Sequence, residues 1–181
     1  IDRIFIFVLN KLKKWPCQTK SFRKGWGNDE QVFDSPGVGV PSVSLDRFPF
    51  DAYHTNYDNM KLVRFEKLNE IVDILLNVVD TLEKDYIPKP VYRVEICLTR
   101  FNLYADWTYD RSSYDLNTIL LDNLWSGLSV IDISLKYNID ADLIFNFYSK
   151  FIENGLIKMD FVTPNYTRST RFIPNLFSMK C

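Results

Sequence analysis

The fold of the last third of this 181-residue chain is decided by two adjacent segments, Ser129-Val-Ile-Asp-Ile-Ser-Leu-Lys-Tyr-Asn138 and Asp140-Ala-Asp-Leu-Ile-Phe-Asn-Phe-Tyr-Ser-Lys-Phe-Ile-Glu153. Ser and Asp are favoured just before the first turn of a helix, because their side-chain oxygens accept the unpaired backbone N–H groups there. Asn138 and the pair Asn154-Gly155 are typical of helix ends. The sequence therefore predicts two short consecutive helices, with Ser129 and Asp140 as their N-caps.

A further helix and a hairpin are predicted on either side of this pair. Residues 115–128 carry apolar side chains at helical spacing, namely Ile119, Leu120, Leu124 and Trp125. Residues 156–162 alternate in polarity and are separated from residues 166–172 by a turn at Pro164-Asn165, which is typical of a β-hairpin. Three helices closed by a hairpin predict a winged-helix domain.

The domain boundaries are predicted from composition. We place the winged-helix domain at residues 113–181, after a linker at residues 89–112 and a first part at residues 1–88. The seam is indicated by Pro88 and Pro90, because two prolines two residues apart discourage both a helix and a central strand.

The first part contains a predicted strand and a long amphipathic helix. The strand is expected at residues 38–45, which are rich in β-branched residues and are followed by Asp46. Residues 61–82 form the clearest predicted helix, with apolar positions that recur every three or four residues: Leu68, Ile71, Val72, Leu75, Leu76 and Val79. Another helix is expected at residues 1–14, before Pro16. A strand followed by such a helix indicates an α/β layer.

The composition excludes several classes of protein. A hydrophobic share of 46% and a charged share of 25% are ordinary for a globular chain, so a disordered chain is excluded. No apolar run approaches the roughly 18 residues of a membrane span. The net charge of −1 gives no whole-chain argument for binding nucleic acid or anionic lipid. Cys17, Cys97 and Cys181 are odd in number and far apart, which argues against a disulfide framework or a thiolate zinc site and favours the cytoplasm.

The first residues are unusual for the start of a chain. Ile1-Asp2-Arg3 leads directly into Ile-Phe-Ile-Phe-Val-Leu, and Asn10-Lys-Leu-Lys-Lys-Trp15 then follows instead of the small-residue cleavage site of a signal peptide. We interpret this start as the middle of a helix or strand. The chain is therefore expected to be the C-terminal piece of a longer protein.

Three motifs along the first part carry a family resemblance. They are Gly27-Asn-Asp-Glu-Gln-Val-Phe33, Gly39-Val-Pro-Ser-Val-Ser-Leu45 and the box Tyr53-His-Thr-Asn-Tyr-Asp58. Their order resembles the C-terminal third of co-catalytic zinc aminopeptidases, whose fold glutaminyl cyclases share. In architecture, the chain is most similar to the bacterial aminopeptidase-like family that carries a winged helix after its peptidase domain. The resemblance spans residues 2–172 and implies a partial α/β aminopeptidase-type layer followed by the winged-helix domain.

The resemblance implies roles for four residues. His54 matches the family's last zinc ligand, and Tyr53 matches a neighbour that hydrogen-bonds the tetrahedral intermediate in some members. Asp29 matches a residue near the reaction centre in the cyclase branch, and Asp58 is placed to orient the imidazole as a partner of the ligand. In this family zinc polarises a carbonyl and activates a water molecule, and a phenol can stabilise the developing oxyanion.

Each of these residues also has a purely structural interpretation. His54 is the only histidine, and a single histidine is often a loop or capping residue. Tyr53 could pack in an aromatic rim. Asp29 could cap the turn through Phe33, and Asp58 could cap the helix that starts near Lys61.

Zinc is expected in a complete parent protein rather than in this chain alone. A catalytic zinc ion takes about three protein ligands, and the sequence offers one imidazole and scattered carboxylates. We therefore expect the chain to supply His54 and a substrate-side loop without being catalytic by itself. Its expected partners are a peptide or amide substrate and either the missing N-terminal part of the peptidase domain or further copies of itself. The missing strands are expected to leave one sheet edge and one helix face unburied.

A non-catalytic interaction module is the alternative function. A winged helix can dock on protein or on nucleic acid, but residues 140–153 carry three acids and Lys150 as their only base. Such a helix repels phosphate, and Arg168 and Arg171 on the predicted wing add little positive charge. The sequence therefore favours a protein surface over DNA for this domain.

Overall fold

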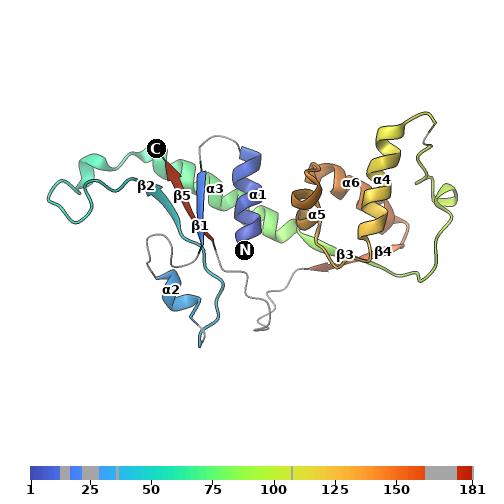
Figure 1. The fold of residues 1–181 in the computed structure, drawn as a ribbon, viewed down its shortest axis with the longest axis horizontal. Coiled ribbons are helices and arrows are strands. Elements are labelled where there is room, and N and C mark those ends of the chain that lie inside the picture. The colour runs from blue at the N-terminus through green and yellow to red at the C-terminus, as the bar shows by residue number, and fades with distance from the viewer. Residues whose placement is uncertain (13–16, 22–28, 36, 107, 162–174, 181) are drawn as a thin grey trace. The chain divides into compact units, whose positions relative to one another are not determined.

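The computed structural model describes residues 1–12, 17–21, 29–35, 37–106, 108–161 and 175–180. Its contacts divide the chain into two compact units (Figure 1). Unit 1 comprises Ile1–Glu83 and Asn165–Cys181, and unit 2 comprises Lys84–Pro164. Among the described helices, none is long and apolar enough to cross a membrane.

Unit 1 combines helices with a small mixed sheet, so it belongs to the α/β class. Its elements are α1 (Asp2–Leu12), β1 (Cys17–Ser21), α2 (Glu30–Phe33), β2 (Leu45–Phe48), the 3-10 turn η1 (Met60–Leu62), α3 (Phe65–Lys84) and β5 (Asn175–Lys180). The strand order is β1-β5-β2. The C-terminal strand β5 is central, antiparallel to β1 and parallel to β2 (Figure 1). The sequence patterns did not predict β5.

The two helices predicted in the first part are confirmed. Helix α1 buries Ile4, Phe5, Val8 and Leu9, which recur on one face. Helix α3 begins at Phe65, slightly later than predicted, because Val63 has an extended backbone after η1. Its buried side chains, Ile74 and Val78, are four residues apart and lie on one face.

The strand predicted at residues 38–45 is wrong, because β2 begins only at Leu45. The backbone before it is used in a turn that follows α2. Both Val38 and Gly39 donate their N–H groups to the Ser35 carbonyl, and Val40 donates to Phe33. Gly39 has a φ of 68°, a left-handed conformation that glycine adopts without strain. The β-branched composition predicted a strand, but the backbone N–H groups of these residues are used in hydrogen bonds within the turn.

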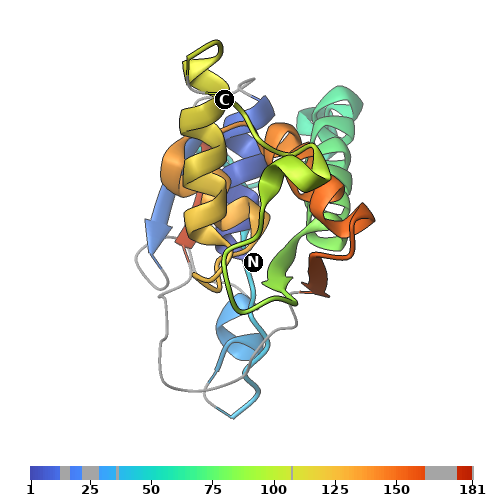
Figure 2. The same cartoon turned by 90° about the vertical axis from the view of Figure 1, so that its right-hand side faces the viewer.

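Unit 2 contains helices and a two-stranded antiparallel sheet. Its elements are β3 (Tyr86–Pro90), the 3-10 turn η2 (Leu98–Phe101), α4 (Arg111–Asn123), α5 (Val130–Tyr137), α6 (Ala141–Glu153) and β4 (Ile157–Phe161). Strand β3 pairs with β4, and α6 contacts both α5 and β4 (Figures 1 and 2). Helix α4 lies about four residues earlier than the predicted helix at residues 115–128.

The helix caps predicted in unit 2 are confirmed. Ser129 accepts the N–H of Asp132, whose carboxylate accepts the N–H of Ser129 in return, so the pair forms a capping box. Asp140 accepts the N–H of Asp142 at the start of α6. Asn138 ends α5 with a φ of 53°, in the left-handed region that Asn tolerates.

A strand occupies the segment where the prolines predicted only a seam. In a strand the N–H groups of alternate residues point to the same side. Val91, just after β3, donates its N–H to the carbonyl of Leu156, just before β4. Pro88 and Pro90 alternate with Val91 along the strand, so their backbone nitrogens, which carry no hydrogen, point to the edge away from β4. The two-residue spacing that appeared to break the strand is therefore compatible with one. The second arm of the predicted hairpin, at residues 166–172, lies outside the described residues, and so do the turn at Pro164-Asn165 and most of the predicted wing.

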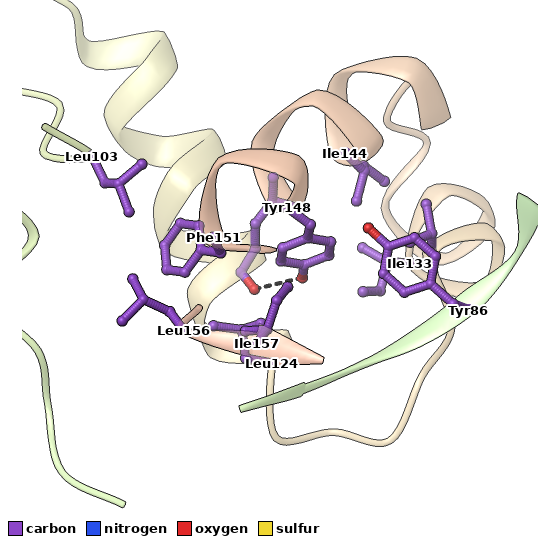
Figure 3. Close-up of a cluster of buried hydrophobic side chains, with 11 residues drawn as sticks. Tyr86, Leu103, Leu124, Ile133, Ile144, Tyr148, Phe151, Leu156 and Ile157 are labelled. Atoms are coloured by element: carbon purple, nitrogen blue, oxygen red, sulfur yellow. Dashed lines mark hydrogen bonds between the residues drawn. The ribbon is translucent and has the colours of Figure 1, made fainter. Parts of the chain in front are cut away.

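A closed apolar core holds unit 2 together (Figure 3). The cluster comprises Tyr86, Leu103, Leu120, Leu124, Val130, Ile133, Ile144, Tyr148, Phe151, Leu156 and Ile157. The buried Tyr148 hydroxyl donates to the Leu120 carbonyl at 2.8 Å, which satisfies its polar atom and connects α6 to α4. Asp85 is also buried, and its carboxylate accepts the N–H of Ile131 in the first turn of α5 at 3.1 Å. This bond joins Asp85, the residue just before β3, to the positive end of α5.

Candidate functional site: the His54 loop

The predicted metal ligand lies on a tightly bonded loop between β2 and α3, at residues 49–60, which we call the His54 loop. Two backbone bonds form its first turns, from Tyr53 N to Phe50 O at 2.9 Å and from Thr55 N to Ala52 O at 3.0 Å. The Thr55 hydroxyl also donates to Ala52 O at 2.6 Å and accepts the Tyr57 N–H at 3.2 Å. These bonds fix the backbone on both sides of His54.

His54 adopts a left-handed backbone with a φ of 61°. Few residues other than glycine adopt this conformation, although histidine is among those enriched there, and it persists only where neighbouring bonds impose it. The turn bonds on both sides of His54 supply that constraint. Sequence reasoning selected His54 but gave no indication of its positive φ, because the conformation follows from the whole loop.

The two aromatic residues of the box lie together on the surface. The rings of Tyr53 and His54 stack with centroids 3.9 Å apart and an interplanar angle of 22°. Both side chains are exposed, and Tyr53 also lies near Phe50, with centroids 6.2 Å apart. The loop thus presents an imidazole and a phenol as one unit, outside the core of unit 1.

The loop does not bring Asp58 to the imidazole. Among the described residues, neither Asp58 nor Asp29 forms a hydrogen bond with His54. The hydrogen bond by which Asp58 was expected to orient the imidazole is therefore not formed in this structure. Asp58 does not cap the following turn either. That position belongs to Asn59, whose side chain accepts the Lys61 N–H at 3.1 Å and donates to Tyr57 O at 3.0 Å.

Asp29 immediately precedes the short helix α2. Its carbonyl accepts the N–H groups of Val32 and Phe33, while its carboxylate makes no capping bond to the helix. The side chain is exposed, so the capping role that the sequence also allowed is not seen.

Sequence reasoning overlooked a second carboxylate in this region, Asp46 on β2. Burial raises the pKa of Asp46, the Ser44 hydroxyl opposes this by donating a hydrogen bond, and the negative charge of Glu30 raises the pKa further. A half-buried acid was detectable only from the fold, because the sequence marks Asp46 simply as the end of an apolar run.

An ion-pair cluster connects β2 to α3. Arg47 on β2 donates to the Glu70 carboxylate and, at 3.3 Å, to the Lys67 carbonyl. The Lys67 ammonium lies 3.1 Å from Glu70. The hydrogen bond from Arg47 is the largest cause that lowers the pKa of Glu70. Glu70 on α3 therefore holds the strand that precedes the His54 loop.

The described residues do not by themselves make a zinc site. Within this part of the chain, no group of three or more His, Cys, Asp or Glu side chains is close enough to hold a metal ion. His54 contributes one exposed nitrogen donor, whereas a catalytic zinc ion takes about three protein ligands. Any zinc chemistry at this loop would therefore need donors besides those described.

One helix beside the loop leaves a broad apolar surface exposed. Seven apolar side chains of α3 are between 41% and 73% exposed, and we call them the α3 face: Phe65, Leu68, Val72, Leu75, Leu76, Val79 and Leu82. Five of the six apolar positions that predicted this helix belong to the α3 face, and Ile71 is the exception. Monomeric proteins rarely expose contiguous apolar patches of this kind, and larger ones mark interaction surfaces. The predicted periodicity was right, but the face it identified faces solvent in this chain.

Comparisons with known proteins relate the chain to peptidase-like proteins. Residues 1–85 match a family model described as a domain of unknown function (DUF4910). A Clostridium acetobutylicum protein, named for polysaccharide biosynthesis and an aminopeptidase-like domain, is 39% identical over 62 residues, which are 33% of this chain and 14% of that protein. A crystal structure from Clostridium acetobutylicum, named as a peptidase, aligns with a TM-score of 0.52 at 19% identity and covers 87% of this chain.

The chain covers only a small share of the length of each of these proteins. The chain spans 14% of the curated relative and 35% of the solved peptidase chain. The structural match shows that the chain shares the fold of part of that molecule.

Proposed function

We propose that this chain is the C-terminal portion of a zinc-dependent aminopeptidase-like hydrolase and supplies its last metal-ligand histidine, His54, together with a substrate-side loop. The observation that carries the proposal is the His54 loop, which holds an exposed imidazole and the Tyr53 phenol in one stacked unit. The loop lies within the residues that match the family model. A fixed, exposed donor suits a metal ligand better than a residue that only fills a turn.

The proposed roles of the other residues follow from the same resemblance. Tyr53 is the group that hydrogen-bonds the reacting carbonyl, and Asp29 lies on the substrate side. Asp58 orients His54 only if the loop shifts in a complete site, since no bond joins the two here. The reaction class is hydrolysis of an N-terminal peptide bond or a related amide bond, and the proposed compartment is the cytoplasm.

The remaining metal ligands and the general base belong, in this proposal, to another part of a complete domain. Two observations support this. The chain corresponds to 35% of the solved peptidase chain. The α3 face exposes seven apolar side chains on a helix about 30 Å long, at about 1.5 Å per residue, which is the kind of surface that a further layer covers.

The first experiment measures zinc and turnover in a longer parent protein. His54→Ala should reduce the zinc content and lower kcat/KM for an aminoacyl amide by at least about 100-fold. Removing even a residue that only hydrogen-bonds a metal ligand lowers metal affinity or activity by about 10–100-fold, and His54 is proposed as a ligand itself. Asn56→Ala, an exposed change on the same loop, is the matched control and should leave both unchanged. A parent unaffected by His54→Ala, or stoichiometric zinc with turnover in the 181-residue chain, would overturn the proposal.

A second experiment tests whether the α3 face is covered in the parent. If the Leu76 side chain is buried in the parent, Leu76→Ala should lower its unfolding free energy by about 2–5 kcal/mol. In the 181-residue chain the same substitution should change the unfolding free energy by no more than about 0.5 kcal/mol. Val94→Ala, at an exposed position of unit 2, serves as the control. Equal costs of Leu76→Ala in the two proteins would contradict a covering layer.

The second candidate function is a non-catalytic interaction module, with the winged helix as the docking unit. It is favoured by the closed core of unit 2, which does not depend on the residues of the His54 loop. The zinc measurement separates the two candidates, because an interaction module predicts no effect of His54→Ala on metal content.

A further inference from the structure

A cavity of about 550 Å³ opens in unit 2 between the segment at residues 92–98 and helix α4, and we call it the α4 cavity. This volume lies within the range of ligand pockets. Tyr92 and Leu98 line it from the segment, and Leu121 lines it from the helix. All three side chains also pack against the apolar core of unit 2. The inner wall of the cavity is therefore fixed by the same packing that folds the unit.

An aromatic pair lines the cavity. Trp125, just after the end of α4, is 61% exposed. Its ring meets the Tyr92 ring edge-on, with centroids 6.0 Å apart and an interplanar angle of 85°. Burial raises the pKa of the Tyr92 hydroxyl, so this ring stays neutral at physiological pH. An exposed indole held beside a second ring offers a π-face to cations and an apolar surface to side chains.

The charges around the cavity favour a cation. Glu95 and Asp122 line it together with Arg93, which gives one net negative charge. Asp122 lies in the last turn of α4, and that turn contains no basic residue. The partial negative charge at the helix C-terminus therefore adds to the two carboxylates. An indole next to such a negative potential is the environment that binds guanidinium groups.

We propose that the α4 cavity binds an extended peptide segment through an arginine side chain that stacks on Trp125 and pairs with Asp122 and Glu95. An apolar side chain next to that arginine contacts Leu121, and Arg93 donates to carbonyl oxygens of the segment. The occupant is thus a basic, partly apolar peptide or the corresponding segment of a partner protein. This inference does not rest on the proposed peptidase-like function, because the cavity lies outside residues 1–85.

The experiment uses the complete 181-residue chain and two capped peptides, Ac-Ala-Leu-Arg-Ala-NH2 and Ac-Ala-Leu-Glu-Ala-NH2. Binding is followed by two-dimensional NMR of the indole N–H groups, with the Trp125 resonance assigned through Trp125→Phe. The arginine peptide should shift this resonance saturably with a Kd of about 0.1–1 mM, as expected for a contact of this size. The glutamate peptide should bind at least about tenfold more weakly, because the two carboxylates repel it.

Two variants locate the site. Asp122→Asn should weaken binding of the arginine peptide by about 3- to 10-fold, and so should Trp125→Ala, whose binding is followed through the backbone amide resonances of residues 92–98 because the indole is gone. Glu153→Gln, which removes an exposed acid on α6, is the control and should leave the Kd unchanged. Because Trp125 and Asp122 are exposed, both variants should fold, as backbone amide spectra will show. The proposal is overturned if both peptides bind equally, if no saturable shift occurs up to about 5 mM, or if Asp122→Asn binds like the unchanged chain.

Discussion

Helices α3 and α6 have apolar residues at the same helical spacing but differ in what covers them. Helix α6 buries Ala141, Ile144, Tyr148 and Phe151 within unit 2. Helix α3 buries Ile74 and Val78 and leaves the seven side chains of the α3 face exposed. Periodicity indicates that a helix forms and which residues share a face. The partner that covers the face must come from elsewhere in the fold. Among the residues that the structure describes, the apolar face of α6 has such a partner and the α3 face does not.

The largest difference should appear when one side chain is truncated on each helix. Phe151→Ala should destabilise unit 2 by about 3–5 kcal/mol, because it leaves a cavity in a closed core. Leu76→Ala, its counterpart on the α3 face, should change stability by no more than about 0.5 kcal/mol. Hydrogen exchange of the amides of α5 and α6 measures the first effect, and that of α3 measures the second. Similar losses at the two sites would show that the α3 face is buried in solution.

The next effect tests the polar bond between β3 and α5 in the core of unit 2. Asp85→Ala leaves the Ile131 N–H buried without an acceptor and should cost about 1–3 kcal/mol in the same exchange measurement. Asp85→Asn keeps an acceptor oxygen at this position and should cost less. If Asp85→Ala proves as mild as Leu76→Ala, the bond contributes nothing to the closed core.

Smaller effects with opposite pH dependence are expected at the two carboxylates of unit 1. Glu70 has a pKa below its ordinary 4.5, so its stabilisation is complete above that value and is lost as the pH falls through the folded pKa. Asp46 has a pKa above its ordinary 3.8, so its charged form destabilises unit 1 once the pH exceeds the folded pKa.

Melting temperatures at pH 7 and pH 3 test both signs. Glu70→Gln should lower Tm at pH 7, and Asp46→Asn should raise it. Both differences should shrink at pH 3. Asp58→Asn, at an exposed position of the His54 loop, is the control and should show no comparable trend. A difference at pH 3 as large as that at pH 7 would rule out titration of these groups as the cause.

The smallest expected effect is on DNA. The exposed acids of α6, Asp142 and Glu153, should keep the Kd of the complete chain for duplex DNA weaker than about 10⁻⁴ M at low salt. A gel-shift titration measures this. Binding that falls steeply with salt and disappears in the double variant Arg168→Ala and Arg171→Ala would show that this helix unit does engage phosphate.

The sequence by itself determined the local features of this protein. The caps at Ser129 and Asp140 and the extent of α6 follow from bonds within a few residues, so pattern reasoning located them. The Tyr53-His54 pair was likewise selected from its motif, because the residues are adjacent in the chain.

The tertiary structure decided everything that depends on distant partners. Strand β5 lies between β1 and β2 although well over a hundred residues separate β5 from each of them, and no local pattern encodes that pairing. β3 is a strand because β4 pairs with it on the side away from its missing proline donors. The burial of Asp46 and the exposure of the α3 face likewise depend on which distant elements lie against them. Local hydrogen bonds are set by neighbouring residues, whereas burial is set by whichever element covers a surface.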